Sequence, residues 1–126
     1  MLANYLWVAI GGALGSMARF GLATWVATLT GPIFPWGTLL INVLGSFVIG
    51  WFGTLTGADG HLMVSSEARI FVMIGICGGF TTFSSFSLQT LELVNEGELL
   101  PAIGYILGSV ILCLVFVWIG FLLGRW

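Results

Sequence analysis

The sequence predicts an all-α membrane protein with four transmembrane helices. Of its 126 residues, 59% are apolar and 6% are charged, whereas a soluble domain carries roughly a quarter charged residues. The charges also leave four stretches free of Asp, Glu, Lys and Arg, at residues 1–18, 20–58, 70–91 and 99–124. A bilayer core requires about 20 apolar residues per helix, so each stretch is long enough for one span.

The first predicted helix covers about residues 3–27 and the second about residues 36–55. Between them, Gly31, Pro32 and Pro35 end one helix and turn the chain. The connection at 56–66 that follows the second helix is the most polar loop in the chain.

The third predicted helix covers about residues 67–93, and its middle is interrupted. The segment GGFTTFSSFS, residues 78–87, weakens a helix where no water can satisfy broken backbone bonds, and this favours a helix break supported by protein or by a filled cavity. The freed carbonyls can bind a cation, and the amino end of the next half-helix attracts an anion. A kinked packing helix whose hydroxyls bond to their own backbone is the alternative.

The fourth predicted helix covers about residues 101–124, with Pro101 in its first turn. Tyr105, Ser109 and Cys113 follow one another at a spacing of four, which lines one helix face. This face is either a polar track or a packing surface. The four helices form a single domain in which short connections make successive helices antiparallel.

Glycines recur at a spacing of four in several predicted helices, and such pairs let helix backbones approach closely in lipid. The pairs are Gly11/Gly15, Gly53/Gly57, Gly75/Gly79, Gly104/Gly108 and Gly120/Gly124. We expect tight helix contacts within or between subunits.

Several side chains within the spans have two interpretations each. Phe80, Phe83 and Phe86 form a stripe that either packs or offers positive ring edges to an anion. Asn42, with Thr38 one turn earlier, is either a link between helices or a ligand for a passing ion. Arg19 either snorkels to the surface or gives a vestibule a positive potential.

The residues that are absent exclude other classes of protein. Apart from Glu92 at a helix end and Glu67 at the edge of the polar loop, no carboxylate lies within the spans, which disfavours a proton-coupled exporter. Lys and Arg do not cluster, so nucleic-acid binding is excluded. No metal-ligand cluster and no nucleophile with an adjacent base supports an enzyme.

The few basic residues predict that the chain inserts in both orientations. An even number of spans places Arg69 and Arg125 on one side of the membrane, while Arg19 leans toward the other. Orientation normally follows an excess of Lys and Arg in cytoplasmic loops, and this difference is very small. The hypothesis is a pair of opposed copies.

Three segments resemble the Fluc (CrcB-type) fluoride channels of bacteria. They are GGALGSMAR at 11–19, GTLLINVLGSFVIG at 37–50 and GICGGFTTFSSFS at 75–87. The resemblance implies passive fluoride efflux through the bacterial inner membrane by a multi-pass, antiparallel, dual-topology homodimer with two pores. Its partners would be the fluoride ion, a second copy and the lipid bilayer.

The resemblance also implies roles for individual residues. The implied fluoride pore residues are Asn42, Phe83, Phe86, Thr82, Ser84, Tyr105, Ser109 and Thr38, with Arg19 in the vestibule. A structural sodium ion would be held by the backbone carbonyls of Gly78 and Thr81 from each copy. The chain departs from the family at Gln89, where many relatives have an acid, and at Cys113, where Ser or Thr is common.

Two alternatives remain at this level. A small dual-topology proton-coupled multidrug exporter has a similar size, but it needs an acid in the first span, where this chain has only Arg19. A non-transport membrane assembly subunit would use every Gly and Phe for packing alone.

Overall fold

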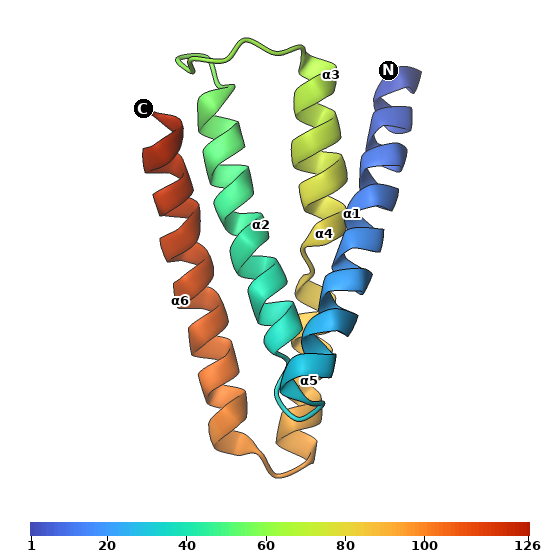
Figure 1. Ribbon diagram of the computed structural model, residues 1–126, viewed down its shortest axis with the longest axis vertical. Coiled ribbons are helices and arrows are strands. Elements are labelled where there is room, and N and C mark those ends of the chain that lie inside the picture. The colour runs from blue at the N-terminus through green and yellow to red at the C-terminus, as the bar shows by residue number, and fades with distance from the viewer.

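The computed structural model describes residues 1–126, and the chain is entirely helical (Figure 1). The elements in order are α1 (Leu2–Thr30), α2 (Trp36–Leu55), α3 (Ser66–Arg69), the π-helical segment η1 (Ile70–Cys77), α4 (Gly78–Phe80), α5 (Phe83–Asn95) and α6 (Leu99–Gly124). Four stretches are long and apolar enough to cross a membrane, with α3 to α5 together forming the third. The chain is therefore a multi-pass membrane protein.

The helix ends lie close to those expected from the sequence. The second helix coincides with the range 36–55, while α1 continues beyond residue 27 to Thr30. It ends where Gly31 adopts a φ of 82°, a conformation that glycine reaches without steric cost. The last helix begins at Leu99, and Pro101 occupies its first turn, where a missing N–H breaks no helical bond.

The winding of the third span was not predicted. Residues Ile70–Cys77 form a π-helix directly before the interrupted region. This segment is apolar throughout, so no periodic pattern in its sequence distinguishes one winding from another. Short π-helical segments occur frequently at functional sites, and this one leads directly into the break.

Successive spans run antiparallel, and both chain ends lie at the same end of the bundle as the loop at 56–66 (Figure 1). As a result, alternate spans run parallel, and these make the most extensive contacts: α2 with α6, and α1 with η1 and α4. The bundle is thus two parallel pairs joined by short connections.

Glycines form the contact surfaces within both pairs. A Cβ placed on Gly11 would lie 2.5 Å from the Phe71 carbonyl oxygen, and one on Gly79 would lie 2.5 Å from that of Gly12. In the other pair, a Cβ on Gly120 would lie 2.8 Å from the backbone nitrogen of Trp51. These backbones approach so closely that no side chain fits between them.

Other glycines of the predicted pairs have open surroundings. A Cβ on Gly104 or Gly108 would meet no neighbouring atom. Most large apolar side chains also point outward, and only 17 of the 126 residues are buried. Outward-facing apolar side chains are expected where the neighbour is lipid or a second protein chain.

The polar loop is fixed to the helix ends. Nη1 of Arg69 donates to the Gly53 carbonyl at 3.3 Å and to the Thr56 hydroxyl. The His61 ring nitrogen Nε2 lies 2.9 Å from the Arg125 carbonyl oxygen. The loop therefore joins three of the four spans at this end of the bundle.

Candidate functional site

The third span is broken between α4 and α5, in agreement with the predicted interruption. Thr81 (φ -83°, ψ 158°) and Thr82 (φ -153°, ψ 124°) are extended, and the helix resumes at Phe83. The Thr82 hydroxyl caps the new helix by accepting a hydrogen bond from the Ser85 N–H at 3.1 Å. A β-branched residue with a capping oxygen favours this local geometry.

The Asn42 side chain holds the break from α2. Its Nδ2 donates to the Thr82 carbonyl at 3.0 Å, and its Oδ1 accepts from the Thr82 N–H at 2.8 Å. The amide thus replaces both helical bonds that Thr82 lacks, and one N–H of Nδ2 is left for another acceptor. Of the two interpretations of Asn42, the structure contains the link between helices.

The break is also held from α1. The Gly79 carbonyl accepts hydrogen bonds from Arg19 Nε at 3.1 Å and from Ser16 Oγ at 3.4 Å. The half-buried Arg19 side chain therefore lies beside the break. Sequence reasoning missed Ser16, whose only signal was its place in the GGALGSMAR segment.

Two backbone carbonyls at the break face no donor. Thr81 directs its N–H and its hydroxyl at the Cys77 carbonyl, at 3.0 and 2.8 Å. Neither the Thr81 and Thr82 N–H groups nor any side chain donates a hydrogen bond to the carbonyl oxygen of Gly78 or of Thr81. A Cβ on Gly78 would meet nothing, and Gly78 and Thr81 both line the large cavity described below.

Two rows of polar side chains run along the contact between α2 and α6. They repeat every four residues and comprise Thr38, Asn42 and Ser46 on α2, and Tyr105, Ser109 and Cys113 on α6. Thr38 and Tyr105, which begin the two rows, are both buried. One turn beyond the other end of the rows, Gly50 packs against Val117. Gly50 and Val117 are the same number of positions apart as Thr38 and Tyr105, so this contact between parallel helices places each residue of one row opposite a residue of the other.

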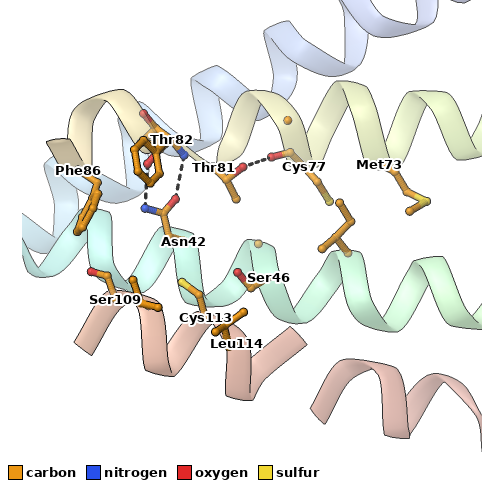
Figure 2. A pocket seen from close by; sticks show the side chains of 15 residues that line it. Asn42, Ser46, Met73, Cys77, Thr81, Thr82, Phe86, Ser109, Cys113 and Leu114 are labelled. Atoms are coloured by element: carbon orange, nitrogen blue, oxygen red, sulfur yellow. Dashed lines mark hydrogen bonds between the residues drawn. The ribbon is translucent and has the colours of Figure 1, made fainter. Parts of the chain in front are cut away.

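A cavity of about 610 Å³ lies between these rows and the break (Figure 2). Its lining includes Asn42, Ser46, Thr81, Thr82, Phe83, Phe86, Ser109 and Cys113. The Ser109 side chain is only 6% exposed and its hydroxyl has no hydrogen-bond partner. A polar atom in this state is rare in folded proteins and indicates that a ligand or water is expected beside it.

Three aromatic rings lead from the break toward one end of the bundle. The Phe83 and Phe86 centroids are 5.5 Å apart, and those of Phe86 and Tyr105 are 5.0 Å apart. Phe83 is 79% exposed in the single chain. Phe80, the third member of the predicted stripe, lies outside the cavity and beside Gly45, so the stripe is divided.

Tyr105 lines neither this cavity nor a second one of about 230 Å³ near the connection from α1 to α2. Its ring lies beside Phe86, which lines the first cavity, and its hydroxyl contacts Gln89, which lines the second. Tyr105 is fully buried, and its hydroxyl donates to Gln89 Oε1 at 2.8 Å. Gln89 and Thr38 line the second cavity. Ser84 lines neither cavity, and its hydroxyl lies 3.3 Å from that of Thr82.

The fold and the site together define a class of protein. Four membrane spans, a broken helix and a cavity lined by ring edges, an amide and unpartnered hydroxyls are the parts of a membrane transport protein for a small ion. A family model described as "CrcB-like protein, Camphor Resistance (CrcB)" matches residues 6–121. The chain belongs to this family.

Similar proteins extend over nearly the whole chain. One from Methylocella silvestris is 62% identical over 93% of this chain and 89% of its own length. Another from Opitutus terrae is 57% identical over 92% of this chain and 88% of its own. A third, from Thermus thermophilus, is 50% identical over 96% of this chain and 93% of its own. Each of the three is named a fluoride-specific ion channel, FluC.

Proposed function

We propose that the protein is a fluoride-specific ion channel through which fluoride leaves the cytoplasm passively. The observation that carries this proposal is the 62% identity with a named fluoride-specific channel over 93% of the chain. A channel of this kind transports an ion and performs no covalent chemistry, so the protein is a transporter and not an enzyme.

The residues around the cavity supply the groups that a fluoride path requires. Fluoride is strongly hydrated, so each water that it loses must be replaced by a donor. The free N–H of Asn42, the Ser109 hydroxyl and the positive ring edges of Phe83 and Phe86 are such donors. Arg19 is bonded to the Gly79 carbonyl outside this lining, so no full positive charge binds the ion too tightly.

We propose that two copies pair in opposite orientations, in the inner membrane of a bacterium, and enclose two pores. The exposure of Phe83 supports this, because a second chain would cover an aromatic ring that is exposed beside the helix break. The near balance of Arg19 against Arg69 and Arg125 supports it as well, since neither orientation is favoured.

The face of the break that carries the Gly78 and Thr81 carbonyls fits a sodium ion. Carbonyl oxygens suit a hard cation, and two copies placed face to face would offer four. The bound ion would supply positive charge that joins the two breaks. If so, replacing sodium in the detergent solution by a large organic cation should lower the melting temperature of the dimer.

The fluoride channel is tested with purified protein in liposomes and a fluoride electrode. We expect rapid efflux without a proton gradient, and an about tenfold loss in Phe83→Ile and Phe86→Ile, equivalent to about 1.4 kcal/mol of lost ion stabilisation. Phe80→Ile is the matched control because this ring lies outside the cavity. Efflux that requires a proton gradient would indicate an exporter, and no efflux at all an assembly subunit.

A further inference from the structure

Hydroxyl groups in this chain commonly bond to their own helix. The side chains of Thr30, Thr56, Ser87 and Thr90 each donate to the carbonyl four residues earlier, at 2.7 to 3.0 Å. This bond satisfies a hydroxyl where no water is present. Ser46 on α2 differs from these four, because its hydroxyl forms no hydrogen bond and lines the 610 Å³ cavity (Figure 2).

Ser109 on α6 shares the same condition on the opposite wall. Its hydroxyl is buried, has no partner and belongs to the same cavity lining. By contrast, Thr81 and Thr82 use their hydroxyls on the backbone of the break. Two donors without partners therefore face one cavity from the two helices that the Gly50 and Val117 contact holds in register.

The next residue of the α6 row offers the cavity a weaker hydrogen-bond donor than Ser109 does. Cys113 lines the cavity one turn after Ser109, and a thiol is a poor hydrogen-bond donor. Oxygen donors on α6 thus stop at Ser109. On the facing helix, the row continues to Ser46, one turn beyond Asn42.

We propose that Ser46 is a further fluoride-binding residue, whose hydroxyl and that of Ser109 donate to the same ion between α2 and α6. Cys113 lies at the edge of this site, and Ser46 provides the hydroxyl that the thiol does not. The proposal rests on the proposed fluoride channel. A small anion that accepts strong hydrogen bonds fits two unpartnered hydroxyls that line one cavity, whereas chloride is larger and accepts weaker hydrogen bonds.

Cys113 provides a direct measurement of binding. In a Cys77→Ser background it is the only thiol. Its thiolate attacks a small methanethiosulfonate reagent, a new S–S bond forms, methanesulfinate leaves and the thiol proton goes to water. We expect fluoride to slow this labelling and equal chloride not to. The fluoride concentration that halves the rate then reports occupancy of the site.

Ser46→Ala is expected to raise that half-protecting concentration about tenfold, because one hydrogen bond to an anion is lost. Ser46→Thr keeps the hydroxyl and should retain protection. Ser87→Ala is the matched control, since this serine lies outside the cavity and bonds to the Phe83 carbonyl. A half-protecting concentration within about twofold of the parent in Ser46→Ala would overturn the proposal.

Fluoride flux gives a second and independent measurement, which also decides the matter if the thiol does not react. In liposomes, Ser46→Ala should slow efflux, and adding Cys113→Ser should restore it, because the new hydroxyl lies in the same site. If Ser46→Ala elutes at the wild-type volume and its efflux is as fast as that of the wild type, the role of Ser46 is contradicted. No efflux from the wild type would instead contradict the proposed channel.

Discussion

The amide of Asn42 illustrates what a single residue contributes to this molecule. An extended peptide within the membrane leaves an N–H and a C=O without helical partners, and each is costly in hydrocarbon. Both groups of Thr82 are bonded to one side chain, at 2.8 and 3.0 Å. The break is therefore a defined geometry fixed by a neighbouring helix.

Asn42→Ala should destabilise the protein by roughly 2–4 kcal/mol, since two hydrogen bonds are lost and the Thr82 groups remain unsatisfied. Thermal unfolding in detergent measures the effect, and fluoride efflux should fall with it. Asn95→Ala is the matched control, because Asn95 is exposed at the end of α5. An Asn42→Ala protein that unfolds at the wild-type temperature would show that the amide does not hold the break.

At the scale of single residues, the sequence did not predict which side chains contact each other at the site. It singled out Asn42, but its partner Thr82 lies 40 positions away, and no local pattern joins the two. Ser46 stands beside Gly45 and looks like another small packing residue. Its lack of a bond to its own helix is visible only in three dimensions.

At the scale of elements, prediction succeeded where chemistry is local. Charge-free stretches located the spans, and the Gly-Gly-Phe-Thr-Thr run located the break. The π-helix at Ile70–Cys77 escaped notice because winding depends on what the helix packs against. The pairing of α2 with α6 was equally hidden, because it joins spans separated by the whole third helix.

Two adjacent glycines on α1 test the close helix contact. Gly11→Ala should destabilise the protein by about 1–3 kcal/mol, because its Cβ would meet the backbone of Phe71 and Gly75. Gly12→Ala is the control, since its Cβ meets no atom within the chain. Chemical denaturation in mild detergent compares the two. Equal losses would mean that the contact of α1 with the third span is looser than described.

At the scale of the whole molecule, the sequence predicted that both ends lie on one side, and the bundle agrees (Figure 1). The sequence alone did not predict what covers the exposed face around Phe83. The proposed second copy would leave only a weak trace in one sequence, here the small difference in the number of basic residues at the two membrane sides.

Dual topology makes a direct prediction. A cysteine added after Trp126, in a Cys77→Ser and Cys113→Ser background, should be labelled by an impermeant reagent in about half of the molecules of intact cells. The near equality follows from the balance of Arg19 against Arg69 and Arg125. Adding several lysines to the loop at 56–66 should then shift the labelled share strongly to one side. One-sided labelling of the unaltered chain would refute paired opposite orientations.

Because amino and carboxyl ends emerge at one bundle end, gene duplication faces a geometric constraint in this architecture. Two repeats encoded in tandem and joined by a short linker would enter the bilayer pointing the same way. An inverted pair within one polypeptide demands an additional crossing segment between the halves. Two separate genes do not need this extra segment, provided that each encoded protein has its own excess of Lys and Arg on one side of the membrane.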